Sequence, residues 1–596
     1  MKLHSFTKFA LLCTMLIFCN NIYSQDKENL YPVNNYKELE NPNPTDLESW
    51  KGIKDINCGW GELDIRYRKE TPVTIGELNK TITLTGWRGE RVAAQIVVST
   101  PKIIEALSYK VGELKNKRED FTINNSDLLT GFVRFVITDE LNKDGLGACG
   151  HRPDPSVYQS HLASDPIDHI TNVLEISENS TQPIWVAINI PSNAKAGLYK
   201  GEVTIYNNDT EIGKLYLNLK VIDRVLPEPK DWKFHLDLWQ NPYASARYYN
   251  VEPFSDNHFN KMKADFSLYA NAGGKSITAS LMHKPWGGQT QDYFESMVTW
   301  IKKADGTWMY DFTVFDRWVE FMMDLGVTKS INCYSMVPWD LSFQYFNQAT
   351  NSFKYLKAKP GDKEYDYFWG SMLSAFAEHL KEKGWFEITH IAMDERPLEA
   401  MFAAKKVIET ADPNFKMSLA GNYFKELEQD LDDYCVAFRY KFPVSEIEKR
   451  RKDNKVTTFY TCCTEPKPNT FTFSNPAEAA WLAGYALNYN YDGYLRWALN
   501  SWVEQPLLDS RFRSWAAGDT YLIYPGGRTS IRFERLREGI QNFEKYHILK
   551  NEFTKSNNKR NLKKLEKAIT SFNPDNLSNE TINETVYKLE KVLNSF

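Results

Sequence analysis

The chain has 596 residues, of which 42% are hydrophobic and 14% aromatic, and its formal net charge at pH 7 is -5. This length exceeds one ordinary domain, so we expect two large domains, each with its own core. A charge this close to neutral argues against a nucleic-acid partner and against binding to an anionic membrane surface. The 17 Trp, 32 Tyr and 34 Phe residues fill cores and also suit stacking on the flat apolar faces of a ligand.

Residues 1–24 predict a cleavable signal peptide. The basic stretch MKLHSFTK precedes the apolar run FALLCTMLIF, which is too short to span a bilayer, and cleavage is expected after Ser24. Cys19 would carry the lipid in a lipoprotein, but the bulky Phe18 precedes it where a small residue is required, so we do not expect lipid anchoring. The prediction is a secreted or periplasmic protein with no membrane span.

Residues 25–56 are polar, contain NPNP and predict a flexible lead-in. From 57 to 226, short runs of alternating polarity such as RVAAQIVVS and QPIWVAINI are separated by turn residues, and no helical pattern of similar strength interrupts them. This pattern predicts an antiparallel β-sandwich. The region has no convergent polar cluster, so we expect it to support the next domain. Pro227 and Pro229 mark the boundary between the two domains.

Residues 230–549 alternate between apolar strand-like runs and amphipathic helices. The strand candidates are FHLDLW from 234, KSITASLM from 275, KSINCYSMV from 329, ITHIAMDE from 388, KMSLAGN from 416, DYCVAFR from 433, TTFYTCC from 457 and DGYLRWALNSW from 492. About eight such units predict a (β/α)8 TIM-type barrel as the catalytic domain. A doubly wound open sheet is the alternative, but no Gly-rich phosphate loop follows the first strand. Residues 550–596 predict a short C-terminal helical extension that packs against the barrel.

The six cysteines beyond the signal peptide show no CxxC spacing. Cys58 and Cys149 are candidates for a disulfide in an oxidising compartment. The other four lie in strand-like runs and are expected to be small buried hydrophobic residues: Cys333, Cys435, Cys462 and Cys463. No HExxH or carboxylate–histidine spacing is present either, so we expect neither a metal ion nor a cofactor.

The stretch HIAMDERP, residues 390–397, places two carboxylates, Asp394 and Glu395, at the end of the fourth strand candidate. In barrels of this type the C-terminal ends of the strands carry the chemistry. Successive side chains of a strand point to opposite faces, so the two acids can reach different groups of a substrate. Burial near a second carboxylate raises the proton affinity of one of them, which suits a general acid. The alternative is that the two acids cap the following helix and complement its dipole.

Aromatic residues lie at or after the ends of several strand candidates: Trp239, Tyr334, Trp339, Tyr460, Trp497 and Trp502. Each alone is more often a core residue than a ligand platform. Because the strand ends of a barrel meet at one rim, we interpret the group as substrate-binding residues of a sugar pocket. In such a pocket the aromatic faces pack on the apolar faces of pyranose rings.

Four stretches resemble glycoside hydrolase family 123: GWRGERVAAQ at 86–95, AKAGLYKGEVTI at 194–205, MDERP at 393–397, and a long specific stretch at 496–546 that begins RWALNSWVEQ. The resemblance implies a β-sandwich followed by a (β/α)8-type catalytic domain, and retaining β-N-acetylgalactosaminidase activity without a metal. It also implies a substrate-assisted mechanism, in which the 2-acetamido oxygen of the sugar attacks the anomeric carbon. In that mechanism Asp394 holds the acetamido N–H, and Glu395 protonates the leaving oxygen and then activates water.

The expected partner is therefore a glycan or glycoconjugate with a β-linked N-acetylhexosamine, and no feature of the sequence specifies an oligomeric state. One alternative is a β-N-acetylglucosaminidase or another glycosidase, because the two N-acetylhexosamines differ only at the C4 hydroxyl. The other is a non-catalytic carbohydrate-binding protein, against which the intact pair of Asp394 and Glu395 argues.

Overall fold

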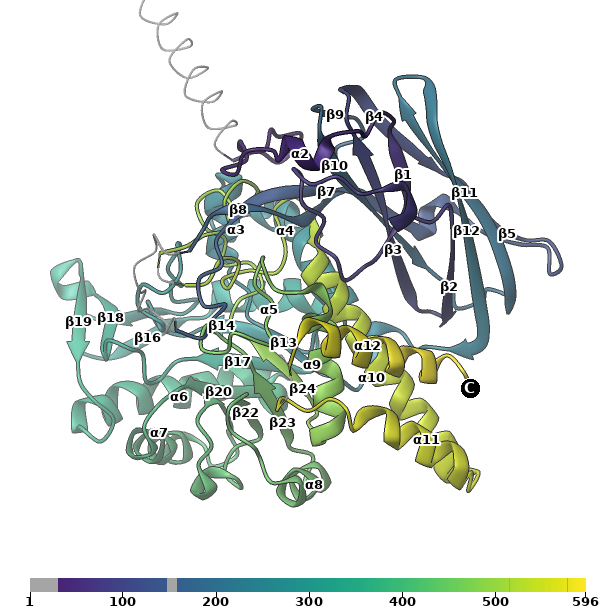
Figure 1. Cartoon of the computed structure of the whole chain (residues 1–596). Coiled ribbons are helices and arrows are strands. Elements are labelled where there is room, and N and C mark those ends of the chain that lie inside the picture. The colour runs from purple at the N-terminus through teal and green to yellow at the C-terminus, as the bar shows by residue number, and fades with distance from the viewer. Residues whose placement is uncertain (1–30, 147–157, 514, 576) are drawn as a thin grey trace, which may run out of the picture.

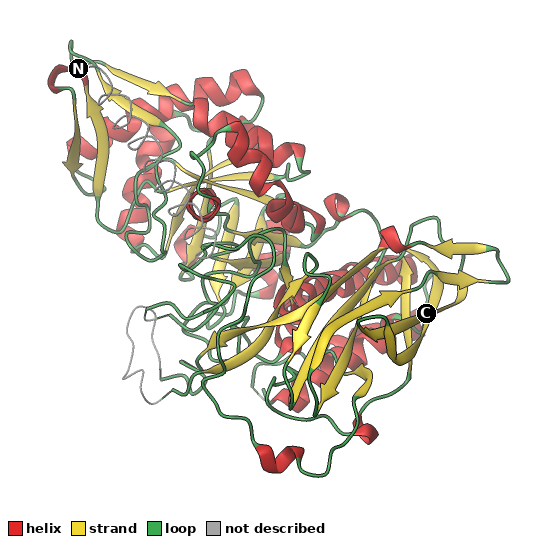
Figure 2. Cartoon of the chain, turned by 90° about the horizontal axis from the view of Figure 1, so that it is seen from above, coloured by secondary structure: helices red, strands yellow, loops and turns green. Residues whose placement is uncertain are grey.

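The computed structural model describes residues 31–146 and 158–596, apart from residues 514 and 576. The predicted signal peptide, Cys19 and Cys149 lie outside these residues. A sandwich of two sheets is followed by a barrel of parallel strands and by C-terminal helices (Figure 1). The view from above separates the sandwich from the barrel and shows long helices beside both (Figure 2). The predicted fold class is confirmed.

The N-terminal domain consists of one sheet ordered β1-β3-β10-β7-β8-β25 and a second ordered β2-β12-β11-β4-β9, to which β5 and β6 are joined. The pairs are antiparallel except β12 with β2. Alternation explains the burial: in β12, Leu215, Leu217 and Leu219 are buried, while their neighbours are at least partly exposed. The strands are β1 Asn57–Gly61, β2 Thr81–Arg88, β3 Arg91–Thr100, β4 Ile104–Val111, β5 Leu114–Asn116, β6 Phe121–Ile123, β7 Leu128–Thr138, β8 His161–Asp168, β9 Leu174–Ile176, β10 Ser180–Asn189, β11 Gly197–Asn207, β12 Thr210–Val225 and β25 Thr529–Ser530.

The second domain is built on an eight-stranded parallel sheet ordered β13-β24-β23-β22-β21-β20-β17-β14. A bridge between Leu236 and Gly274 joins the two ends, so the barrel is nearly closed. All eight strand candidates are confirmed. They could be recognised in the sequence because strands buried on both faces form near-continuous apolar runs. The strands are β13 His235–Leu238, β14 Ser276–Ser280, β17 Ser330–Tyr334, β20 Thr389–Asp394, β21 Lys416–Gly421, β22 Asp433–Ala437, β23 Val456–Tyr460 and β24 Gly493–Arg496.

Helices cover the barrel and extend beyond it. In α6, apolar residues recur every three or four positions, from Tyr365 through Phe368 and Trp369, and Gly384 at φ 71° ends the helix. Across the described residues, no helix is both long and apolar enough to cross a membrane. The helices are α2 Leu47–Trp50, α3 Pro242–Tyr249, α4 Asp256–Asn271, α5 Thr313–Asp324, α6 Lys363–Lys383, α7 Leu398–Ala411, α8 Val444–Lys452, α9 Pro476–Tyr489, α10 Ile531–Lys555, α11 Lys559–Ile569 and α12 Asn579–Leu593.

A four-stranded sheet ordered β16-β15-β18-β19 is inserted beside the barrel, and the sequence did not predict it. β15 Thr299–Lys302 and β16 Trp308–Asp311 follow β14, whereas β18 Ser342–Asn347 and β19 Ser352–Lys357 follow β17. β18 and β19 lie at the edge of the molecule away from the sandwich (Figure 1). Strands this short carry too few residues for a clear alternating pattern.

A segment of the barrel domain completes one sheet of the sandwich. β25 pairs antiparallel with β8, so a segment from the second domain forms the last strand of the first sheet. Beside it, the Arg528 guanidinium donates to Asp168 at 2.7 Å and the Arg532 guanidinium donates to Asp165 at 2.9 Å, and all four residues are buried. The two domains therefore share a paired, desolvated interface rather than a flexible link.

The prediction of a flexible lead-in is wrong for residues 31–56. Trp50 is buried, and its indole N–H donates to the backbone oxygen of Glu70. Glu38 accepts from Arg134 at 2.7 Å and from Lys69 at 2.6 Å. The polar residues of this segment thus pair with charges of the sandwich, a contact that composition alone does not reveal.

The disulfide candidate is wrong at Cys58, which carries a free, buried thiol, and Cys149 lies outside the described residues. Cys463 is buried as predicted, and it is also disulfide-bonded, which the sequence did not predict. Cys333 and Cys435 are buried free thiols inside barrel strands, as predicted.

Candidate active site

A cavity of about 320 Å³ opens at the carboxyl ends of the barrel strands. Both predicted acids line it, together with residues that follow several other strands. The remaining lining residues are Trp239, Trp286, Gln289, Trp339, Ala420, Tyr460, Cys462, Cys463, Leu495, Trp497 and Trp515. The cavity therefore combines one acidic wall with several aromatic walls.

The acids differ in position because the chain turns sharply between them. Asp394 ends β20 and is 6% exposed, whereas Glu395 is exposed and has φ +36°, a conformation that non-glycine residues rarely adopt. The Glu395 N–H donates to the Ala420 oxygen at 2.8 Å. A side chain at Gly421 would place its Cβ 2.9 Å from the Glu395 nitrogen, so only glycine fits there. Neighbouring β21 thus fixes the turn that separates the two acids.

Asp394 is held by an aromatic and a cationic side chain. The Trp339 indole donates to Asp394 Oδ2 at 3.3 Å, and the Arg396 guanidinium donates to the Asp394 backbone oxygen at 2.6 Å. Arg396 also stacks over the Trp339 ring at 4.4 Å. Asp394 Oδ1 has no hydrogen-bond partner within the described part of the chain. One carboxylate oxygen is therefore anchored and the other is left to a ligand.

Burial raises the pKa of Asp394 to about 7, against the opposing charge of Arg396 and with the help of Glu395. Asp394 does not cap the next helix, because α7 begins at Leu398 and has no side-chain cap. The alternative that Asp394 caps the following helix is thus excluded.

Glu395 is positioned by Tyr460 at the end of β23. The Tyr460 hydroxyl donates to Glu395 Oε1 at 2.6 Å. Burial, and then the negative charge of Glu395, raise the pKa of Tyr460 well above its usual value. Tyr460 therefore stays a neutral hydrogen-bond donor that orients the carboxylate.

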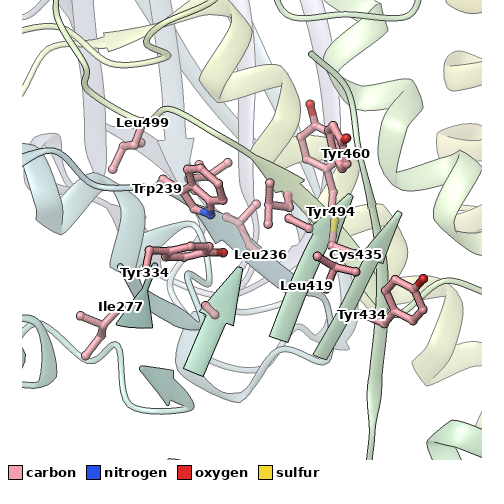
Figure 3. Close-up of a cluster of buried hydrophobic side chains, with 14 of the residues drawn as sticks. Leu236, Trp239, Ile277, Tyr334, Leu419, Tyr434, Cys435, Tyr460, Tyr494 and Leu499 are labelled. Carbon is pink, nitrogen blue, oxygen red and sulfur yellow. The ribbon is translucent and has the colours of Figure 1, made fainter. Parts of the chain in front are cut away.

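Tryptophans stack at the floor of the cavity. The rings of Trp239 and Trp286 are stacked with centroids 4.7 Å apart, and Tyr334 packs against Trp239 at 4.6 Å. Figure 3 shows Trp239 and Tyr334 on the same side of the cluster and Tyr460 on another strand. The indole N–H groups of Trp239 and Trp286 are buried and find no acceptor among the residues that are described. Two donors are therefore available to ligand oxygens.

Four of the six predicted aromatic residues line the cavity, and two do not. Trp239, Trp339, Tyr460 and Trp497 belong to its walls. Tyr334 is fully buried, and it supports Trp239 without lining the cavity.

Trp502 is also fully buried. Its indole donates to the Ile523 oxygen at 2.8 Å, and its ring packs on Tyr248. A position after a strand end indicated the right rim but not the direction in which the side chain points.

Sequence reasoning missed Trp286, Gln289 and Trp515, which line the cavity from loops. The only signal for Trp286 was a tryptophan in HKPWGG, shortly after the second strand.

The sandwich also reaches this rim, since the Asn142 side chain, after β7, donates to the oxygen of Cys463 at 2.6 Å. The first domain thus braces a wall of the cavity, besides packing on the barrel.

Asp394 and Glu395 are the only carboxylates among the described residues that line the cavity. Elsewhere in that part of the chain, no group of three His, Cys, Asp or Glu side chains could hold a metal ion. The described cavity therefore offers two adjacent acids as its carboxylates.

Family models match both domains. The model of the glycoside hydrolase 123 catalytic domain matches residues 239–549, more than half of the chain, and that of the glycoside hydrolase 123 N-terminal domain matches residues 60–207. The chain belongs to glycoside hydrolase family 123. Membership of the family makes the protein a glycosidase with a glycan substrate, which agrees with an aromatic cavity that contains two acids.

Individual proteins are similar to this chain to very different extents. A family 123 glycoside hydrolase from Clostridium perfringens, described for glycolipid glycan hydrolysis, is 27% identical over 91% of this chain and 98% of its own, with a TM-score of 0.82. A family 39 glycoside hydrolase from Bacteroides cellulosilyticus WH2 is 11% identical over 78% of this chain and 82% of its own, with a TM-score of 0.33. Uncharacterized shell protein 12 from Margaritifera margaritifera is 37% identical over 62 residues, which are 10% of this chain and 81% of that protein.

Proposed function

We propose that this family 123 glycosidase removes terminal β-linked N-acetylgalactosamine from glycans or glycoconjugates by a retaining, substrate-assisted mechanism. The proposal rests on Asp394 Oδ1, which belongs to a cavity-lining carboxylate and has no donor from the described residues. A buried polar atom without a hydrogen bond is unfavourable. The N–H of a 2-acetamido group would supply the missing donor.

In the first step, the acetamido oxygen attacks the anomeric carbon while Glu395 gives its proton to the glycosidic oxygen. The bond to the leaving group breaks, and a ring with oxazolinium character forms. Asp394 accepts the N–H, and its negative charge balances the positive ring. In the second step, Glu395 takes a proton from water, the water attacks the anomeric carbon, and the acetamido group is restored. Two inversions leave the configuration retained.

The arrangement of the acids supports this mechanism. Retaining enzymes with a carboxylate nucleophile place two carboxyl groups about 5–5.5 Å apart on opposite sides of the bond that is cleaved. Here the described cavity offers only consecutive residues, and each has a separate anchor: Trp339 for Asp394 and Tyr460 for Glu395. A nucleophile supplied by the sugar makes a third carboxylate unnecessary.

The substrate source and the compartment belong to the same proposal. The likeness to the Clostridium perfringens enzyme makes glycolipid glycans one source of the terminal sugar. The disulfide at Cys463 supports action in an oxidising compartment, as expected of a secreted or periplasmic protein. The alternative activity is that of a β-N-acetylglucosaminidase, because the same acids would serve either epimer.

Hydrolysis of paired chromogenic substrates tests the proposal. The aryl β-N-acetylgalactosaminide should be cleaved faster than the matching β-N-acetylglucosaminide, and the aryl β-galactoside should be inert because it lacks the acetamido nucleophile. A faster glucosaminide would establish the alternative sugar. Rapid cleavage of the β-galactoside would refute substrate assistance.

Glu395→Gln separates the two acids. Removing the proton donor should slow cleavage about 10²–10⁴-fold for a poor leaving group. An activated aryl leaving group needs little protonation, so the rate of the variant on such a substrate should fall much less. An equal loss for both leaving groups would show that Glu395 is not the general acid.

A further inference from the structure

The inserted four-stranded sheet presents a row of apolar side chains on its outer face. By strand register, Met309 lies opposite Ile301, Ile301 is next to Phe346, and Phe346 lies opposite Phe353. The row thus crosses all four strands. Phe353 is 60% exposed, and Tyr355, two residues along β19 on the same face, is 54% exposed. Exposed apolar rows of this kind indicate a binding surface.

This apolar row does not hold the sheet on the protein, because the side chains of the opposite face pack against the core. Trp300 is buried and stacks on Phe368 of α6 at 4.4 Å, with the rings nearly parallel. Phe343 is buried and packs against Trp369 of the same helix. The inner face therefore anchors the sheet, while Met309, Phe353 and Tyr355 of the outer face stay largely exposed.

The outer face continues into the cavity of the acids. The Tyr355 ring lies 6.5 Å from that of His283, and the loop that begins there supplies Trp286 and Gln289 to the cavity. The same loop accepts a hydrogen bond from the backbone of Trp339, at the Pro285 oxygen, at 3.2 Å. Trp339 is 44% exposed at the rim and is followed within three residues by β18. Cavity rim and sheet face are thus parts of one continuous surface.

Polar side chains accompany the aromatic ones on this face. Gln344 donates to the Tyr355 hydroxyl at 2.7 Å, and in the next row Ser342 lies opposite Lys357. Rings that cover apolar faces, flanked by groups that bond hydroxyls, form the combination with which proteins bind sugars. A purely apolar partner would displace water from the remaining polar atoms of this face without replacing their hydrogen bonds.

We propose that the outer face of this sheet binds the sugar residues on the leaving-group side of the cleaved bond, with Phe353 and Tyr355 as its stacking rings. The proposal rests on the proposed function, because it takes the cavity as the place of the terminal sugar. It makes the preferred substrate an oligosaccharide that extends past the cleaved bond, rather than a simple glycoside.

The test compares a double variant, Phe353→Ala with Tyr355→Ala, with the control Tyr587→Ala, which removes a ring that is 62% exposed on α12. The kcat/KM is measured for an aryl glycoside and for an oligosaccharide with several sugars on the leaving-group side. The double variant should lose about tenfold or more on the oligosaccharide, because two stacking contacts are removed. It should keep its rate on the aryl glycoside, and the control should keep both rates. Unchanged oligosaccharide cleavage in the double variant would overturn the proposal.

The outcomes separate the two proposals. If the enzyme prefers the glucosamine epimer, the same comparison is made with that sugar, and the sheet is tested independently of the sugar's identity. If no aryl hexosaminide is cleaved, the proposed function fails, and calorimetric binding of the oligosaccharide tests the sheet alone. Equal binding of the oligosaccharide by wild type and double variant would refute the role of the sheet in sugar binding. Loss of a dimer in the double variant with unchanged oligosaccharide cleavage would assign the face to a second copy of the chain instead.

Discussion

Two of the regions of this molecule that bury charge are built differently. At the interface of the sandwich and the barrel, Arg528 is paired with Asp168 and Arg532 with Asp165, all with little or no exposed surface. At the mouth of the barrel, Asp394 is nearly as buried, but one of its oxygens has no donor from the described residues. In the first region both oxygens of each carboxylate have donors within the chain, whereas in the second region one carboxylate oxygen is left for a ligand.

The difference distinguishes structural from functional burial. A buried ion pair is tolerated because each charge replaces the water lost by its partner, and removal of one partner leaves the other uncompensated. A buried carboxylate without a full set of partners is unstable by itself and persists where a substrate completes it. The interface should therefore respond to mutation through stability, and Asp394 through activity.

The largest expected effect is at the interface. Asp168→Ala leaves Arg528 and Arg134 without a carboxylate acceptor that they share, and should lower the free energy of unfolding by about 3–5 kcal/mol. Urea unfolding measures the change, with Asp223→Ala as the control. Asp223 forms an exposed pair with Arg88, which should be worth less than about 1 kcal/mol. Equal effects would remove the distinction between the two kinds of pair.

Asp394→Asn should lower activity, because Asp394 lies at the mouth of the barrel and not at the domain interface. The amide keeps the shape but cannot balance a positive ring, so turnover should fall about 10²–10³-fold. A thiazoline that mimics the cyclised intermediate should also bind more weakly to the variant. Circular dichroism should show an unchanged fold. Activity close to wild type in this folded protein would remove Asp394 from the mechanism.

The pH profile of kcat/KM should reveal the same group. Asp394 must be ionised to accept the N–H and to balance the ring, and burial raises its pKa to about 7. Ionisation of Asp394 should therefore give the profile an acid limb whose midpoint lies at about pH 7, since kcat/KM reports groups of the free enzyme. In Asp394→Asn this acid limb should disappear, although the remaining rate is low. A limb that persists in the variant would belong to a different group.

Tyr460→Phe should have a smaller effect, because Tyr460 positions Glu395. Loss of a hydrogen bond to a carboxylate should lower kcat/KM about tenfold. Tyr434→Phe is the control, since it removes a hydroxyl that bonds the backbone of Asn422 and does not line the cavity. Some glycosidases use tyrosine as the nucleophile. A loss larger than that of Asp394→Asn would favour this role over positioning.

The sequence predicted the strand framework better than the walls of the site. The eight barrel strands were found because burial on both faces requires apolar runs, and the acid pair followed from the end of one run. Trp286 was missed because it lies in a loop with no periodic pattern. Trp502 was misplaced because packing against Tyr248 and Tyr249, which are distant in sequence, determines its direction.

The smallest expected effect concerns stability at Asp394 itself. Its carboxyl has a pKa near 3.8 when exposed and about 7 in the folded protein, so the folded state binds the extra proton between these values. Stability from this group is thus fully present below pH 4 and is lost as the pH rises through 7. Asn is neutral at every pH, so Asp394→Asn should raise the melting temperature at pH 8, on the order of 2 °C for so large a chain. Near pH 4 the two proteins should melt together. Differential scanning fluorimetry across this range measures the difference, and Asp223→Asn, an exposed site, should show no such trend. An Asp394→Asn protein that melts below wild type at pH 8 would mean that the carboxylate already has the partners that the cavity is argued to lack.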